Sequence, residues 1–313
     1  MLIAVFCSSF LFQLSSPSWL FICVGPIALI GLIEDFHIRT SPIFRLLTGF
    51  FSIAIGIALS GIWVSSIAIP AFGTFYLNAF FGIGLTMVAA VALLNALNVI
   101  DGMNGLASFQ ILASSIGLCI IAAFVGDQSI IDLSLVIASA AFGFLVINYP
   151  FGRIFLGDAG AYAFGLLLGW LIILLMAGHP EVSIWSMILL VMWPAVELLL
   201  TICRRFKKSE SVVKPDRLHF HHLIMRGWMV LSRKKISPLF ANSLVVITVS
   251  PFIVLTTALA AKFYDNPSGS AIALIVSMLV YFGFFLLVRS LVLKKKYRDR
   301  AVLLTAPLWK MLG

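Results

Sequence analysis

The sequence predicts an all-α, polytopic integral membrane protein, with about ten transmembrane segments in a single domain covering residues 1–313. Of its 313 residues, 62% are hydrophobic and only 11% are charged, and the mean hydropathy is +1.13. Soluble domains do not reach such values. Most of the ten apolar segments approach the ~20 residues that a helix needs to span a bilayer. They are 1–14, 18–34, 44–66, 78–98, 106–125, 131–148, 158–177, 183–203, 239–262 and 269–292.

The first segment, 1–14, is too short to cross a membrane alone. It has no basic n-region and no small-residue cleavage site, so we expect a shortened first helix rather than a signal peptide. The cysteines lie in or at apolar segments without paired spacing, which predicts small buried side chains rather than disulfides or a zinc pattern. They are Cys7, Cys23, Cys119 and Cys203.

Basic residues lie on one side of the predicted membrane. Every Lys and Arg except Lys262 falls in the loops after the even-numbered segments or at the adjoining helix ends. By the positive-inside rule these loops are cytoplasmic. They are 35–43, 99–105, 149–157 and 203–238, followed by a basic tail, 293–313. The net charge of +9 is therefore one-sided and suits an anionic leaflet or an anionic substrate.

A polar stripe ends the fourth segment, in the stretch NALNVIDGMNGL at 95–106. A carboxylate at the bilayer centre costs roughly 2.5 to 3.5 kcal/mol, so an acid here indicates an interface, a pore or a site. Gly102 and Gly105 let the backbone turn and approach a ligand. The stripe recurs every third residue and consists of Asn95, Asn98, Asp101 and Asn104.

Other chemically active residues fall on the same side. The acids Glu34 and Asp35 end the second segment, and Asp158 lies in FLGDAG at 155–160. The long loop begins with Arg204 and Arg205 and contains PDRLHFHH at 215–222. All the acids named so far lie at cytoplasmic helix ends, which predicts one shared site built from three loops.

Carboxylates that face a basic, histidine-bearing loop favour phosphoryl transfer. Mg²⁺ takes one or two protein carboxylates and fills its other positions with water and phosphate oxygens. Arginines and histidines can then hold a diphosphate, and the helix that begins at 158–160 adds oriented N–H groups. Little else is needed for in-line transfer.

Each feature has a structural alternative. Asp158 alone suits an N-cap, Asp101 an ordinary turn, and Glu34 and Asp35 a solvated helix end. The histidines suit a structural zinc site or a solvated loop, and KKKYRDR at 294–300 a lipid-headgroup anchor. Glu197, inside the eighth segment, is a functional candidate that could instead snorkel or pair with Arg204.

Taken in order, these motifs resemble the polyprenyl-phosphate N-acetylhexosamine-1-phosphate transferases (glycosyltransferase family 4). The likeness runs from GLIEDF to PDRLHFHHLIMRG. The PDRxHxHHL form is most similar to the undecaprenyl-phosphate N-acetylglucosaminyl-1-phosphate transferase branch. The chain differs in Glu34 where the family has Asp, in Asn104 where many members have a second Asp, and in Glu197 where a related branch has Asp. We also expect that the family's first helix and the basic loop after it are missing before Met1.

The resemblance implies roles for particular residues. Catalytic roles fall to Glu34, Asp35, Asp101 and Asp158, of which Asp158 and Asp101 would hold Mg²⁺, with Mn²⁺ as an alternative. Substrate binding falls to Asn95, Asn98, Asn104, Arg204, Arg217, His219, His221 and His222.

The resulting hypothesis is an enzyme of the bacterial inner membrane with a cytoplasmic active site. It would move a HexNAc-1-phosphate from a UDP-amino sugar to undecaprenyl phosphate, release UMP and initiate an envelope polysaccharide such as O-antigen. A homodimer is left open, and no nucleic-acid partner is expected. The alternatives are a catalytically impaired or truncated homologue and a secondary transporter. Transporters place ionisable groups near the midplane, often in repeated halves, which this sequence does not.

Overall fold

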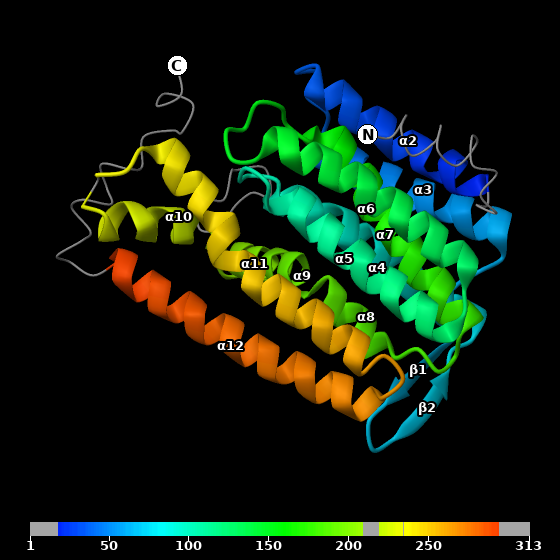
Figure 1. The fold of residues 1–313 in the computed structure, drawn as a ribbon. Helices are drawn as coiled ribbons and strands as arrows, with labels where there is room; N and C mark the ends of the chain where they lie inside the picture. The colour runs from blue at the N-terminus through cyan, green and yellow to red at the C-terminus, as the bar shows by residue number, and fades with distance from the viewer. Residues whose placement is uncertain (1–17, 209–218, 234, 294–313) are drawn as a thin grey trace.

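The computed structural model describes residues 18–208, 219–233 and 235–293, which form a bundle of helices with one small hairpin at its edge (Figure 1). The elements of these residues are α2 (Trp19–Asp35), α3 (Pro42–Ser60), β1 (Ser66–Ile69), β2 (Gly73–Tyr76), α4 (Ala79–Ile100), α5 (Leu106–Val125), α6 (Gln128–Asn148), α7 (Gly157–Gly178), α8 (Ile184–Leu190), α9 (Met192–Lys208), α10 (Phe220–Leu231), α11 (Pro238–Lys262) and α12 (Pro267–Leu293).

The described residues contain seven helices long and apolar enough to cross a membrane, namely α3 to α7, α11 and α12. An eighth is obtained if α8 and α9 are taken as one broken span. The multi-pass helical class is thus confirmed, but the count of ten is not. Helix α2 has only 17 residues. The expected segment 1–14 and the basic tail from 294 lie outside the described residues.

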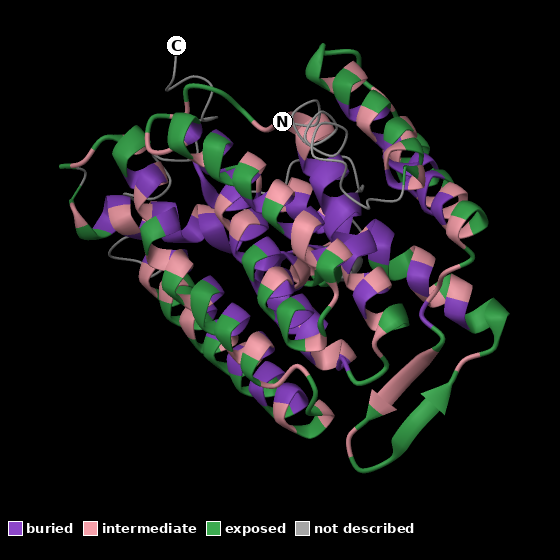
Figure 2. Cartoon of the chain, turned by 45° about the vertical axis from the view of Figure 1, so that its right-hand side comes forward, coloured by how far each residue is buried: buried purple, intermediate pink, exposed green. Residues whose placement is uncertain are grey.

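The expected helix 44–66 is too long at its C-terminal end. Helix α3 stops at Ser60, where Gly61 adopts the left-handed conformation (φ +69°) that suits a residue without a Cβ. The chain then forms the antiparallel hairpin β1–β2, with Ser66 paired to Tyr76. All four residues of β2 are exposed (Figure 2). The hairpin lies at the end of the bundle away from α10 (Figure 1).

The expected segment 183–203 is also not one straight helix, because α8 and α9 meet at an angle of 84°. Pro194 lies four residues after Leu190, and a proline ring clashes with the carbonyl four residues before it in a continuous helix. The Leu190 carbonyl instead accepts hydrogen bonds from Gln110 Nε2 (2.9 Å) and Ser114 Oγ (2.7 Å) of α5. The carbonyl that the break leaves without a helical partner is therefore hydrogen-bonded inside the bundle, as a buried backbone group in a membrane protein requires.

Helix α7 is the most buried span, and α2 and α4 pack directly against it. Small residues permit this close approach, as in other membrane bundles. A Cβ added at Gly31 of α2 would overlap the backbone at Ala159, and one at Gly165 would lie 2.5 Å from the Cα of Leu94. This packing brings the C-terminal ends of α2 and α4 to the N-terminal end of α7. The four predicted acids Glu34, Asp35, Asp101 and Asp158 therefore meet.

Candidate active site

Asp35, at the end of α2, caps the N-terminus of α7. Its Oδ1 accepts a hydrogen bond from the backbone N–H of Asp158 (2.8 Å), and its Oδ2 accepts one from that of Ala159 (3.1 Å). These N–H groups have no partner inside their own helix. Gly157 has a φ of +72°, and a Cβ at this position would lie 2.5 Å from Asp35 Oδ2, so the approach requires glycine. Asp35 is thus a positioning residue for the start of α7.

The side chain of Asp158 is left to face α4. It makes no capping bond, so the N-cap alternative for Asp158 is wrong. Its Oδ1 accepts a hydrogen bond from Asn98 Nδ2 (2.5 Å). The amide of Asn95, one turn earlier, donates instead to the carbonyl of Val91 in its own helix (2.8 Å). Asn98 therefore joins the acids, while Asn95 is satisfied locally.

Glu34 connects α2 to the loop and helix that follow. Its Oε1 accepts a hydrogen bond from Thr40 Oγ1 (2.5 Å), and its Oε2 pairs with Arg45 Nη1 (2.9 Å). The side chain is only 9% exposed, so the solvated-end alternative is wrong for Glu34. Asp35, in contrast, is exposed. Nothing in the sequence singled out Arg45 as the partner, although its place on the basic side is a weak signal.

Asp101 follows the last residue of α4 and lies against the same acids. Burial raises the pKa of its carboxyl to about 8, and the negative charges of Asp158 and Asp35 act in the same direction. Below that pH the group is largely protonated. A cation bound between these carboxylates would stabilise their ionised forms.

The histidines meet the Asp101 turn. A Cβ added at Gly102 would lie 3.3 Å from Nε2 of His221 and 3.5 Å from Cε1 of His222. The rings of His219 and His221 are stacked, with centroids 5.3 Å apart. Burial, together with the nearby charges of His221 and His219, lowers the pKa of His222 to about 2, so His222 is neutral at physiological pH.

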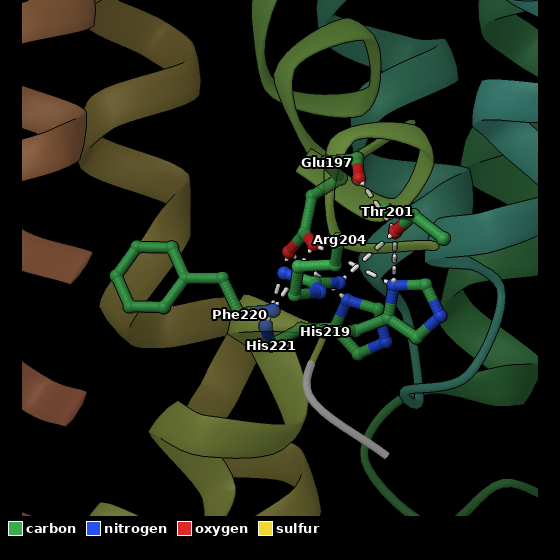
Figure 3. A network of polar contacts seen from close by, with 6 residues as sticks. All are labelled: Glu197, Thr201, Arg204, His219, Phe220 and His221. Atoms are coloured by element: carbon green, nitrogen blue, oxygen red, sulfur yellow. Dashed lines mark hydrogen bonds and ion pairs between the residues drawn. The ribbon is translucent and has the colours of Figure 1, made fainter. Parts of the chain in front are cut away.

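Glu197 holds this histidine cluster (Figure 3). Its side chain is fully buried, which excludes snorkelling. It accepts hydrogen bonds from the backbone N–H groups of Phe220 (3.0 Å) and His221 (3.1 Å), and it contacts Nδ1 of His221 at 3.2 Å. Glu197 thus caps α10, which lies within the expected loop 203–238. This helix was not predicted.

Asn104, the last residue of the polar stripe, hydrogen-bonds to the neighbouring loop that contains Pro150. It is buried, its Nδ2 donates to the carbonyl of Pro150 (2.9 Å), and its backbone N–H donates to Asn242 Oδ1 (2.8 Å). Asn148 supports the same turn by accepting from the backbone N–H of Gly105 (2.5 Å). Asn148 was missed, since a lone amide at a helix end carries no motif. Arg217 lies outside the described residues.

A cavity of about 690 Å³ opens beside these residues, between α3, α4 and α9. Its polar wall includes Glu34, Asn95 and Asn98 from the predicted set, together with His219. Polar residues that sequence reasoning did not assign also line it, namely Arg39, Thr40, Arg45, Tyr162, Thr201 and Arg205. The remaining lining is apolar: Pro42, Leu46, Phe50, Val88, Val91, Ala92, Val99, Leu198 and Ile202. One cavity thus offers basic groups and an apolar surface.

No three His, Cys, Asp or Glu side chains of the described residues are grouped so that they alone could hold a metal ion. The zinc alternative for the histidines therefore has no support in this part of the chain. Asp101 and Asp158 supply two carboxylates, which is the number that Mg²⁺ takes when water and phosphate complete its shell. The mutual repulsion of these acids suits such a cation. The donor set therefore fits Mg²⁺.

The fold and this acidic site define a multi-pass membrane protein with a polar centre at one end of the bundle. Residues 18–176, about half of the chain, match the glycosyl transferase family 4 model. The chain belongs to this family.

Curated relatives carry transferase names. The chain is 30% identical over 225 residues to decaprenyl-phosphate N-acetylglucosaminephosphotransferase of Mycolicibacterium smegmatis, covering 64% of this chain and 55% of that protein. It is 29% identical over 194 residues to the protein of the same name from Mycobacterium tuberculosis, covering 56% and 47%. It is 27% identical over 224 residues to undecaprenyl-phosphate alpha-N-acetylglucosaminyl 1-phosphate transferase of Escherichia coli K12, covering 66% and 57%. The chain spans about half the length of these relatives.

Proposed function

We propose that this protein transfers an N-acetylhexosamine-1-phosphate, from UDP-N-acetylglucosamine or a related UDP-amino sugar, to undecaprenyl phosphate, with release of UMP. The observation that carries the proposal is the meeting of Asp158, Asn98, Asp101 and the histidines at one end of the bundle, beside a half-apolar cavity. The names of the relatives supply the substrate classes. By the positive-inside rule this end faces the cytoplasm, and the bacterial origin of the relatives supports a location in the inner membrane.

The chemistry follows from the groups present. An oxygen of the lipid phosphate attacks the β-phosphorus, the bond between the β-phosphorus and the bridging oxygen breaks, and UMP leaves with the electron pair. The second pKa of such a phosphate is near 6, so it is mostly dianionic at pH 7 and needs no strong base. One phosphoanhydride replaces another, so the step is close to thermoneutral. The protein therefore mainly positions the groups and neutralises charge.

The residues divide these tasks. Arg45, Arg39 and the apolar wall of the cavity suit the phosphate and first prenyl units of the acceptor. Asp158 and Asp101 would hold Mg²⁺, which neutralises charge on the diphosphate when bound. Asp35 positions Asp158 through the start of α7. The histidines and Arg204 are assigned to the nucleotide diphosphate, a role that also extends to Arg217.

Two alternatives remain, and one experiment separates them. The reconstituted protein is supplied with undecaprenyl phosphate, Mg²⁺ and radiolabelled UDP-N-acetylglucosamine or related UDP-amino sugars. We expect a lipid-linked sugar pyrophosphate and UMP. Release of UDP would mean attack at the sugar carbon and would overturn the proposal. Uptake of label without hydrolysis would identify a transporter, and folded protein without any turnover would identify an impaired homologue.

A further inference from the structure

The hydrogen bonds around α9 determine which ring nitrogens of His219 and His221 carry protons. Glu197 and Thr201 are four residues apart, so their side chains lie on one face of α9. This face meets the start of α10, where His219 and His221 are stacked with an angle of 7° between their rings (Figure 3). His219 Nδ1 lies 3.2 Å from Thr201 Oγ1 and 3.8 Å from Glu197 Oε2, and His221 Nδ1 lies 3.2 Å from Glu197 Oε1.

Thr201 has one proton to donate, and that proton is used. Its Oγ1 donates to the carbonyl of Glu197 in the preceding turn (2.8 Å). A hydroxyl has one donor and two acceptor positions. The contact between Thr201 Oγ1 and His219 Nδ1, at 3.2 Å, must therefore be a bond that the histidine donates. The second acceptor position takes Nη2 of Arg204 (3.1 Å).

Glu197 imposes the same arrangement on His221. As a carboxylate it can only accept hydrogen bonds, and it already accepts those of the Phe220 and His221 backbone N–H groups. Its contact with His221 Nδ1 is therefore also donated by the ring. Nε2 of His221 is fully buried and has no hydrogen-bond partner among the described residues. It faces the Gly102 turn, next to Asp101.

We propose that Glu197 and Thr201 are positioning residues that hold His221 and His219 with protons on Nδ1, so that both Nε2 atoms are directed to the substrate. The Nε2 atom of His221, buried and without a partner among the described residues, is then the ring atom left to hydrogen-bond to the sugar nucleotide. This inference rests on the proposed function for the identity of the ligand.

The proton positions can be observed without any turnover. The chain has five histidines, and ¹⁵N-histidine labelling of the protein in bilayers, with each signal assigned by replacement, reports which ring nitrogens carry protons. We expect protonated Nδ1 in both His219 and His221. Thr201→Val should change the His219 signal alone, and Glu197→Gln the His221 signal. An unprotonated Nδ1 in wild-type His221, or a spectrum unchanged by Glu197→Gln, would refute the assignment.

Kinetics test whether Glu197 acts through His221. His221→Asn keeps an N–H near the position of Nδ1 but lacks Nε2, so the α10 cap is retained. Glu197→Gln and His221→Asn should each raise the KM for the sugar nucleotide about 10- to 100-fold, the usual effect of removing a group that orients a ligand. The double variant should be no worse than His221→Asn, and additive losses would overturn the coupling. If wild-type protein makes no UMP, the reaction fails as a proposal while the spectra still decide the proton positions.

Discussion

One oxygen of Asp35 accepts the backbone N–H of Asp158 at 2.8 Å, although 123 residues separate the two acids. This hydrogen bond connects the end of α2 to the start of α7, and it means that the two carboxylates have different roles. Asp35 satisfies helix N–H groups, whereas Asp158 directs its side chain to Asn98 and the acidic cluster.

This division predicts that replacing Asp35 mainly lowers stability, whereas replacing Asp158 mainly lowers activity. Asp35→Ala removes a helix cap, so it should lower the free energy of unfolding by about 1 kcal/mol. Asp158→Asn should leave stability unchanged but lower UMP formation at least ~100-fold, the scale of losing a main electrostatic contact. Thermal unfolding and UMP release measure the two quantities. Asp132→Asn, at the other end of the bundle, serves as the control, and full activity of Asp158→Asn would contradict the assignment.

The raised pKa of Asp101 predicts a pH-dependent requirement for metal. Below its pKa of about 8 the carboxyl is largely neutral and binds a cation weakly, and above it the ionised form binds well. Since a bound cation favours the ionised form, increasing Mg²⁺ should move the midpoint of activity to lower pH. UMP release is measured from about pH 6 to about pH 9 at low and saturating Mg²⁺. A midpoint that does not respond to Mg²⁺ would argue against Asp101 as a ligand.

Membrane orientation can be tested at exposed positions near each end of the bundle. In a background without native cysteines, His37→Cys and Phe155→Cys should resist a membrane-impermeant thiol reagent in intact cells and react after permeabilisation. Thr74→Cys in the hairpin should react in intact cells. All three side chains are exposed, so access depends on the side of the membrane. Labelling in the reverse pattern would place the acidic site outside the cell.

The break between α8 and α9 should depend on the α5 side chains that hold the Leu190 carbonyl. Gln110→Leu alone leaves the bond from Ser114, so its effect should be small. Combining it with Ser114→Ala leaves a buried carbonyl without a side-chain donor, which costs about 1–3 kcal/mol. Thermal unfolding of both variants measures the difference. Equal stability of the single and double variants would mean that another group replaces these donors.

The sequence alone predicted the class of protein, which the structure confirms, and it predicted that the polar motifs lie together. Apolar segment length, one-sided Lys and Arg, and motif order depend on local composition, so they can be read without coordinates. From these patterns we predicted that Asp101, Asp158 and the histidines lie together, and the structure places them at one end of the bundle. The same reasoning missed the bend at Val191, although Pro194 signalled it, because periodicity does not distinguish a straight apolar helix from a broken one.

Only the tertiary structure decided what each polar side chain does. Asp35 ends a predicted helix and Glu197 lies inside another, yet each caps the start of a helix that comes later in the chain. Unpaired N–H groups at a helix start must find acceptors, and the sequence does not specify which acceptor folding brings there. The acceptors are set by the packing of α2 and α4 on α7 and by the position of the first turn of α10 beside Glu197 of α9. It left Asp158 and the Nε2 atom of His221 to face the site.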